Sequence, residues 1–293
     1  MISYKKFSEE SDYYIMRNIV QNNCTRTGHL YPQLHIGNLD FERYAFEESP
    51  DTLYSTIYFI CYETIIIGFI IIQENEFYIT VSVEFQYFMN EILAYIENRF
   101  YAFGTIITTE ANSKNELLNH ALEERGYTKT DSFRFSGICD LSGIEQPPQF
   151  PIGFSIRITE ERDIERRTEL FGLATGGRGT SPERYKRMMQ APSYCEAMDL
   201  IVENDSKEII AYCTIWNDSV SKTAVLEPVA CVAEYRRKGI MKATLLYGMN
   251  QLRDRGTRYM YVGTGGGNKA SQALYKSVGF IEYGINQEWQ KIL

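Results

Sequence analysis

The sequence has no hydrophobic run long enough to cross a membrane. Its longest strongly apolar stretch, residues 65–72, is interrupted by Gly68 and falls far short of the roughly 20 residues that a transmembrane helix needs. That length is typical of a buried strand. The opening residues, MISYKKFSEESDYY, carry acids and tyrosines where a secretory signal needs an apolar core, so we do not expect export.

Clustered metal-binding or disulfide-forming residues are also lacking. The six cysteines lie far apart, with no CxxC and no histidine beside any of them, which predicts free thiols in a reducing cytoplasm. Only three histidines occur, and His29, His35 and Asp40 show no HxH or HxxxH spacing. We therefore predict no metal site and expect His29 and His35 at a domain interface or at the rim of a substrate site.

An excess of positive charge is absent as well. The formal net charge of −8 argues against a general nucleic-acid-binding protein, and we expect neither a nucleic-acid nor a membrane partner. The charges are unevenly divided, because residues 1–150 contain 10 basic and 21 acidic side chains, whereas residues 151–293 contain 20 and 17. The second half is therefore the better host for an anionic ligand.

The length and composition indicate a globular protein of two domains. A hydrophobic content of 44% excludes a disordered chain, and 293 residues suit two domains of ordinary size. Adjacent prolines in the segment 146–151, QPPQFP, predict an extended connector. We predict a first domain over 1–146, a linker over 147–151 and a second domain over 152–293.

The two halves resemble each other. ISYKKFSEE at residues 2–10 parallels FSIRITEER at 154–162 with a shift of 152, and NELLNHALEERGY from Asn115 parallels NKASQALYKSVGF from Asn268 with a shift of 153. The repeat therefore indicates that the chain contains two copies of one α/β unit. In the second half, we predict strands at 154–158, 197–203, 208–216, 223–233, 259–262 and from 280, and helices at 163–171, 182–189, from about 240 to 255, and 269–278.

A strand that turns through a basic, glycine-bearing loop into a helix offers an anion site. The loop contains Arg236, Arg237, Lys238 and Gly239, and Lys242 follows on the helix. The first backbone N–H groups of a helix and its positive dipole end favour a pyrophosphate. The loop is neither a Walker loop nor a Rossmann fingerprint, and GTGGG at 263–267 lacks the following GK.

Two motifs carry a resemblance to a known family. Arg236-x-x-Gly239-x-Met241 is similar to the coenzyme A signature [QR]-x-x-G-x-[GA] of the GNAT N-acetyltransferases, with Met241 in place of the usual small residue. Asn268-x-x-Ser271-x-x-Leu274-Tyr275-x-x-x-Gly279-Phe280 is similar to the family's N-x-x-A-x-x-L-Y-x-x-x-G-F, with serine for alanine. The resemblance covers most of residues 152–293.

The resemblance implies a fold, a cosubstrate and a set of binding residues. The fold would be α/β (α+β), with two tandem GNAT-like domains, each a mixed, mostly antiparallel sheet flanked by helices. The cosubstrate would be acetyl-CoA, without a metal. The binding residues would be Cys231, Val232, Ala233, Arg236, Arg237, Lys238, Gly239, Ile240, Met241, Lys242, Asn268, Ser271 and Tyr275.

Acyl transfer to an amine needs a neutral nucleophile, a stabilised oxyanion and a proton for the departing thiolate. Tyr275 is the candidate acid, because a phenol stays protonated at neutral pH; the alternative is that it only packs. Glu227 is the candidate base, and the alternative is a solvated or arginine-paired carboxylate. Backbone N–H groups of residues 231–233 are the expected oxyanion donors. Cys231 fits a small buried hydrophobe better than an acyl carrier.

The first half lacks these parts. Residues 83–88, VEFQYF, stand where the signature belongs and contain no glycine and no basic residue, and Leu122 stands at the position of Tyr275. We interpret the first half as a degenerate GNAT-like domain.

The predicted function is acetyl-CoA-dependent N-acetylation of a small-molecule or peptide amine by direct attack in a ternary complex, in a monomer or homodimer. Two alternatives stay open, namely a non-catalytic acyl-CoA sensor and transfer of a longer acyl chain. Apolar walls for the acceptor could come from Phe171, Tyr185, Trp216 and Trp289, and Glu288 could hold an ammonium group.

Overall fold

The computed structural model describes residues 1–27, 34–46, 56–174 and 181–293. His29 lies outside the described residues. The elements of the first half are β1 (Ile2–Lys6), α1 (Glu10–Thr27), α2 (Ile36–Phe41), the π-helical turn η1 (Glu42–Phe46), β2 (Ile57–Tyr62), β3 (Ile65–Gln73), β4 (Glu76–Val81), the 3₁₀ helix η2 (Val83–Phe88), α4 (Met89–Phe100), β5 (Ile106–Asn112), α5 (Glu116–Glu124), β6 (Thr128–Asp140) and η3 (Leu141–Gly143).

The second half repeats this order. Its elements are β7 (Phe154–Ile158), η4 (Glu161–Asp163), α6 (Ile164–Ala174), α7 (Pro182–Met188), η5 (Glu196–Met198), β8 (Asp199–Asn204), β9 (Ile209–Asp218), β10 (Thr223–Cys231), η6 (Ala233–Tyr235), α8 (Ile240–Asp254), β11 (Tyr259–Gly265), α9 (Lys269–Ser277) and β12 (Ile281–Ile292). Within the described residues, no helix is long and apolar enough to cross a membrane.

Local sequence signals set several helix ends. The Ser181 side chain accepts a hydrogen bond from the N–H of Arg184, with Pro182 in the first turn of α7. The Asn268 side chain caps α9 in the same way by accepting from the N–H of Ser271. Gly279 closes α9 at a φ of 102°, a conformation that glycine adopts without strain.

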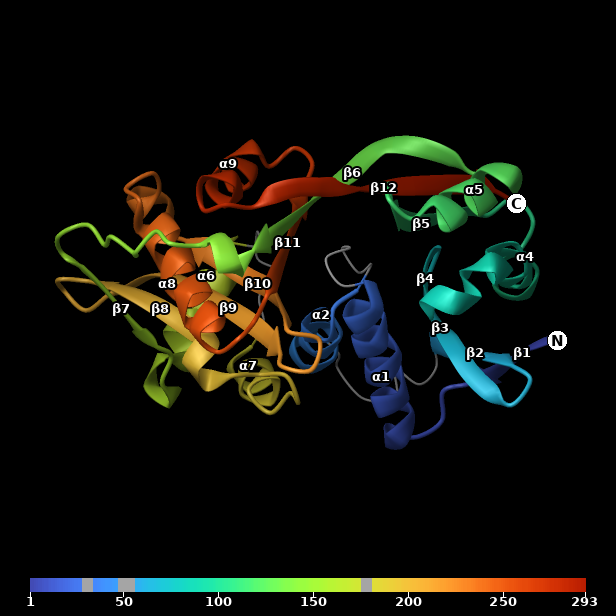
Figure 1. Ribbon diagram of the computed structural model, residues 1–293, viewed down its shortest axis with the longest axis horizontal. Helices are drawn as coiled ribbons and strands as arrows, with labels where there is room; N and C mark the ends of the chain where they lie inside the picture. The colour runs from blue at the N-terminus through green and yellow to red at the C-terminus, as the bar shows by residue number, and fades with distance from the viewer. Residues whose placement is uncertain (28–33, 47–55, 175–180) are drawn as a thin grey trace.

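The two halves share one twelve-stranded sheet in which the last strand of each half has changed places. The strand order is β1-β2-β3-β4-β5-β12-β6-β11-β10-β9-β8-β7. β12 pairs with β5 over Asn286–Ile292, and β6 pairs with β11 over Arg134–Asp140. Figure 1 shows β6 and β12 running side by side across the top of the molecule, with the C-terminus beside α5 of the first half. The domain division at 147–151 stays a prediction, and the sheet pairing does not follow it.

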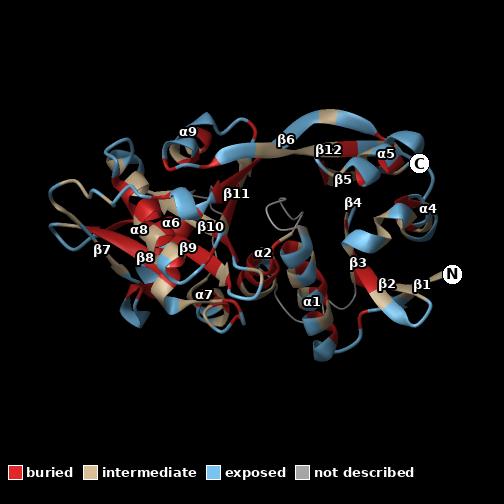
Figure 2. Cartoon of the chain, viewed as in Figure 1, coloured by how far each residue is buried: buried red, intermediate tan, exposed pale blue. Residues whose placement is uncertain are grey.

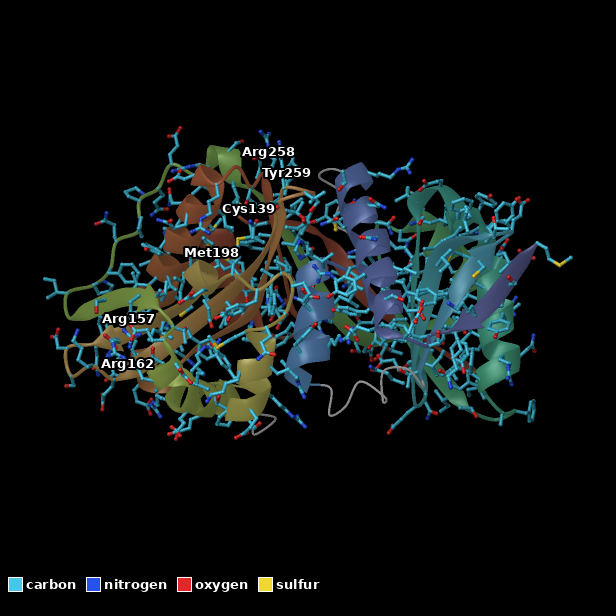
Figure 3. The ribbon with its side chains drawn as sticks, turned by 90° about the horizontal axis from the view of Figure 1, so that it is seen from below. Cys139, Arg157, Arg162, Met198, Arg258 and Tyr259 are labelled. Atoms are coloured by element: carbon cyan, nitrogen blue, oxygen red, sulfur yellow. The ribbon has the colours of Figure 1, made fainter. Side chains whose placement is uncertain are left out.

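The packing of the core follows the exchanged strands. Cys139 of β6 lies in the same buried cluster as Met198 and the inner face of α8, inside the second half (Figure 3). Trp289 of β12 is buried among residues of β4, α4 and α5 in the first half. Trp289 is therefore not a wall of an acceptor site in the second half, because the strand exchange carries it into the first-half core. Glu288, its neighbour on β12, is likewise opposite Glu110 of β5.

Each half of the sheet has helices on both faces. The second half packs α8 and α9 on one face and α6 and α7 on the other, while the first half packs α4 and α5 on one face and α1 and α2 on the other. Buried residues are concentrated on β3 and on β8 to β10, between these layers (Figure 2). Phe171, Tyr185 and Trp216 belong to the cluster under α6 and α7.

Polar side chains of α2 join the two halves. The carboxylate of fully buried Asp40 accepts hydrogen bonds from the hydroxyl of Tyr13, at 2.6 Å, and from the backbone N–H of Ser193, at 2.8 Å. Arg17 forms an ion pair with the same carboxylate. His35, the N-cap of α2, accepts from the N–H of Gly37 and lies 3.1 Å from the hydroxyl of Thr223. His35 is thus at the contact between the halves, where it was expected.

We predict that neither fragment 1–146 nor fragment 152–293 folds stably alone. Fragment 152–293 loses β6, which leaves the edge of β11 unpaired and removes Phe135 and Cys139 from its core. Coexpressed, the two fragments should form a 1:1 complex, measured by size-exclusion chromatography with light scattering. A monomeric 152–293 fragment with cooperative urea unfolding would contradict this, because β12 would then have folded back onto β11.

We predict an acid-labile contact at His35. Burial lowers the pKa of His35 to about 4, whereas an unfolded histidine titrates near ~6.5. Between these values the unfolded chain binds the additional proton, so the stabilisation is complete above about pH 6.5 and decreases as the pH falls toward 4, by about 3 kcal/mol in total. His35→Asn should flatten the dependence of the unfolding free energy on pH over this range. His120→Asn, at a side chain that is 68% exposed, should leave it unchanged.

Candidate functional site

The neighbouring strands β10 and β11 separate in the middle of the second half. They pair in parallel only at Thr223–Val225 with Tyr259–Tyr261. Beyond Val225, β10 continues beside β9, and β11 continues beside β6. A strand irregularity between Leu226 and Val229 and the hydrogen bond from the indole N–H of Trp216 to the carbonyl of Glu227, at 2.5 Å, fix this divergence. No described strand lies on the open edge of β10, so its backbone there can pair with an extended ligand.

The basic loop at residues 236–239, called the anion loop below, follows the carboxyl end of β10. Gly239 adopts a φ of 82° directly before α8, and a Cβ at this position would meet no atom within 4 Å. The glycine is therefore required by the backbone conformation rather than by packing. Ala243 donates the first α-helical hydrogen bond, to the carbonyl of Gly239, so the N–H groups before it face the loop without an intrahelical acceptor.

The basic side chains of this loop are exposed or half-buried. Arg236, Arg237 and Lys238 are exposed, whereas Lys242 is half-buried on α8. The Arg236 Nε donates to the carbonyl of Cys231 at 2.9 Å, which holds the loop against the end of β10. The positive end of α8 and these side chains together can bind a pyrophosphate.

A cavity of about 210 Å³ adjoins the loop. It is lined by Leu170, Ile210, Ala230, Cys231, Val232, Ala233, Glu234 and Arg236. The N–H of Val232 donates to the carbonyl of Ile210 at 2.9 Å, so this N–H is not available as the expected oxyanion donor. Burial raises the pKa of the Cys231 thiol, which disfavours the thiolate that an acyl carrier needs.

Tyr275, on α9, lies in the buried cluster that also contains the inner face of α8, and it is not among the residues that line this cavity or the larger one between the two halves. Its side chain is 3% exposed and packs edge-on against Phe280, with 5.9 Å between the ring centroids. Burial raises the pKa of Tyr275, and the nearby Glu227 carboxylate raises it further, so the phenol keeps its proton at neutral pH. Whether Tyr275 donates that proton or only packs stays a prediction.

The buried face of α9 differs from the sequence pattern. Ala270, Ala273 and Leu274 recur with Val278 at helical spacing, a pattern that predicts a buried face, but the first two are exposed and Leu274 is only half-buried. The helix instead buries Gln272 and Tyr275, one turn apart. Gln272 Nε2 donates to the carbonyl of Gly266 at 2.8 Å, so a polar side chain is satisfied at the glycine turn after β11. A pattern of apolar residues cannot predict that the Gln272 side chain is buried because it binds the carbonyl of Gly266.

A larger cavity, of about 320 Å³, lies between the two halves. The second half contributes Val225, Glu227 and Gly263 to its wall, the first half contributes side chains of α1, α2, η1, β3, β4 and β5, and the exchanged strands contribute Arg134 and Asn286. Burial raises the pKa of Glu227 to about 7, while Arg134 acts to lower it and Glu42 to raise it. A carboxylate with that pKa suits a general base at neutral pH.

The residues that the first half adds to this cavity were not predicted from the sequence, among them Glu42, Tyr78, Glu110 and Asn112. These residues form no recognisable sequence motif, so nothing in the sequence indicated that they belong to one site. Glu110 and Gly263 are 153 positions apart and therefore occupy equivalent positions in the two halves. The exchange of β6 and β12 places both of them at the wall of one cavity. Within the described residues, no group of three His, Cys, Asp or Glu side chains could hold a metal ion.

The equivalent loop of the first half is closed. The 3₁₀ helix η2 runs directly into α4, and Glu84 forms an ion pair with Arg26 of α1. The side chain of Asn23 accepts from the N–H of Val83 at 3.3 Å and donates to the carbonyl of Val81 at 3.0 Å. Side chains of α1 thus bind the backbone and the acidic side chain of this segment, which has no basic residue of its own for a phosphate. Leu122 is buried in the core.

Comparisons with known proteins agree with this geometry. Residues 164–280 match the model of the Acetyltransferase (GNAT) family. No curated protein sequence matches the chain. A GCN5-related N-acetyltransferase from Sphaerobacter thermophilus is similar in structure, with a TM-score of 0.64 and 16% identity over 99% of this chain and 95% of that one. A tandem GNAT protein from the clavulanic acid biosynthesis pathway has a TM-score of 0.65 and 13% identity over 99% and 98% of the two chains.

A GNAT-family acetyltransferase from Colwellia psychrerythraea is also similar, with a TM-score of 0.65 and 11% identity, over 99% of this chain and all of that one. At these identities the likeness concerns the fold. Residues 164–280 match the sequence pattern of the GNAT family, and the whole chain has the fold of tandem GNAT proteins.

We predict that Glu227→Gln removes one inflection from the pH profile of kcat/KM. If the ionised carboxylate accepts the proton of the amine, kcat/KM should rise with pH through about 7 in the native protein, because burial sets the pKa there. The variant should be slower by roughly 10²–10³-fold and lack this inflection. Glu208→Gln, at an exposed position on the turn before β9, is the control. A Glu227→Gln variant that keeps both rate and inflection would exclude this carboxylate as the base.

Proposed function

We propose that the protein is an acetyl-CoA-dependent N-acetyltransferase whose second half binds the cosubstrate and whose acceptor enters the cavity between the halves. The single observation that supports this most is the opening between β10 and β11. The anion loop lies at the end of β10, Glu227 lies at the divergence, and the cavity of about 320 Å³ begins there. A GNAT domain and an acyltransferase fold agree with the proposal.

The residues near the loop fit coenzyme A. The αL glycine, the first N–H groups of α8 and Arg236, Arg237 and Lys238 suit its pyrophosphate, and the unpaired edge of β10 suits the amide groups of pantetheine. Ala233, Ile240, Met241 and Lys242 flank this path, and Asn268 and Ser271 begin the helix that carries Tyr275. Acetyl-CoA supplies an activated thioester.

Two residues of the chain would carry out the two proton transfers, one at the acceptor amine and one at the departing thiolate. Glu227 takes a proton from the acceptor ammonium, directly or through water, so that a neutral amine attacks in a ternary complex. Tyr275 keeps its phenolic proton for the departing thiolate. Transfer does not pass through Cys231, because its thiol is held neutral by burial.

The six unpaired cysteines support a reducing, cytoplasmic location.

We predict that Tyr275→Phe separates chemistry from binding. The substitution removes the hydroxyl while keeping the ring that packs on Phe280. Turnover, followed as release of free CoA thiol with a panel of amines, should fall by roughly 10²–10⁴-fold. Calorimetric titration should give one acetyl-CoA site per chain in both proteins, with similar affinity, because α1 closes the equivalent loop of the first half.

The matched control is Tyr247→Phe on α8, which should leave turnover unchanged. An unchanged rate in Tyr275→Phe would assign Tyr275 to packing. Tight binding of acetyl-CoA without thiol release by the native protein would favour the non-catalytic sensor.

A further inference from the structure

Two side chains of the exchanged strands meet at the wall of the cavity between the halves. In the pairing of β6 with β12, Arg134 is opposite Asn286. Both residues line the cavity. Arg134 is basic and Asn286 carries an amide, so the cavity has two different kinds of hydrogen-bond donor at this point.

The hydrogen bonds around Asn286 leave its amide donor unused. Its side-chain oxygen accepts from the Nδ2 of Asn112 at 2.8 Å and from the hydroxyl of buried Ser136 at 3.2 Å. Because the oxygen is engaged on that side, the Nδ2 group of Asn286 is the part left for a ligand. Within the described part of the chain, no hydrogen bond from this Nδ2 group occurs.

Arg134 is a second unused donor at the same place. Its guanidinium forms no ion pair or hydrogen bond with any described residue, although Glu227 and Glu110 are close enough for Arg134 to influence both carboxylates. The guanidinium reaches over Gly263, where its Nη2 would be 3.8 Å from a Cβ. A planar guanidinium beside an amide N–H group is a donor set that fits the two oxygens of a carboxylate.

We propose that Arg134 and Asn286 bind a carboxylate of the acceptor, so that the acceptor is a free amino acid whose amino group points toward Glu227. The inference rests on the proposed N-acetyltransferase function and names its substrate class. The cavity of about 320 Å³ is at the low end of ligand pockets, which range from roughly 300 to 1,000 Å³, and this favours a small acceptor over a folded or extended peptide.

The acidic side chains of the cavity are compatible with a zwitterion. Glu227 and Glu110 face the ammonium end, and Arg134 lies near both carboxylates. Burial raises the pKa of Glu110, and the nearby Glu76 and Glu288 raise it further, which weakens its repulsion of an anion bound by Arg134 and Asn286. A diamine would satisfy the carboxylates but leave the two donors unused.

The test compares matched pairs of amines that differ only in the carboxylate. CoA thiol release is measured with phenylalanine against phenethylamine, histidine against histamine, and lysine against cadaverine, within a panel of all common amino acids. The native protein should show a kcat/KM at least tenfold higher for the acid of the preferred pair. At about pH 9, where Glu227 stays ionised with or without the arginine, Arg134→Gln should lower kcat/KM for that acid by about 10–100-fold, mainly through KM. The decarboxylated amine should stay within about threefold under the same conditions.

Two further variants make the result specific. Arg134→Lys keeps the charge but not the planar fork and should fall between the native protein and Arg134→Gln. Arg258→Gln removes an exposed arginine that pairs with Asp140 and should change nothing. Calorimetry with acetyl-CoA verifies that each variant still binds the cosubstrate.

The outcomes separate this inference from the proposed function. Acetylation that favours the decarboxylated amines, or that is insensitive to Arg134→Gln, would overturn the amino-acid assignment and leave the N-acetyltransferase proposal standing. Preference for cadaverine in particular would assign the cavity to diamines. Binding of acetyl-CoA with no thiol release from any member of the panel would overturn both.

Discussion

The exchange of β6 and β12 is the constraint on which the rest of the structure depends. Each half of the sheet is completed by a strand that belongs to the other half in sequence, and the two exchanged strands pair with each other through the middle. The halves are therefore joined by continuous backbone hydrogen bonding rather than by a side-chain interface alone. The cavity beneath these strands has walls whose relative positions are set by the sheet itself.

One fold thus serves two different purposes in the two halves. β4 and β5 pair only at Glu76 with Thr108, so the first half diverges as the second half does. The second half keeps a glycine at its loop and another, Gly263, inside its opening, which leaves room for a ligand. The first half fills its loop with α1 and places Glu110 at the position of Gly263. The first half thus contributes a wall of the shared cavity.

Much of the local structure was predictable from the sequence, because its causes are local. The caps at Ser181 and Asn268 and the glycine before α8 all depend on neighbouring residues. The exchange of strands was not predictable, since β12 has the same pattern whether it pairs with β5 or β11. That ambiguity also misplaced Trp289, and it concealed Arg134 and Asn286, which become neighbours only through long-range pairing.

The position of Glu227 links the first half to the chemistry that we propose for the second half. Glu227 comes from β10, yet the two charged groups that influence its pKa most after burial, Arg134 and Glu42, both come from the first 146 residues. Burial of the carboxylate also depends on the first half, because that half supplies most of the cavity wall. Without the wall that the first half supplies, Glu227 would be exposed to solvent, where a carboxylate titrates near its ordinary value of about 4.3. The first half would therefore set the protonation of the proposed base without contacting the thioester.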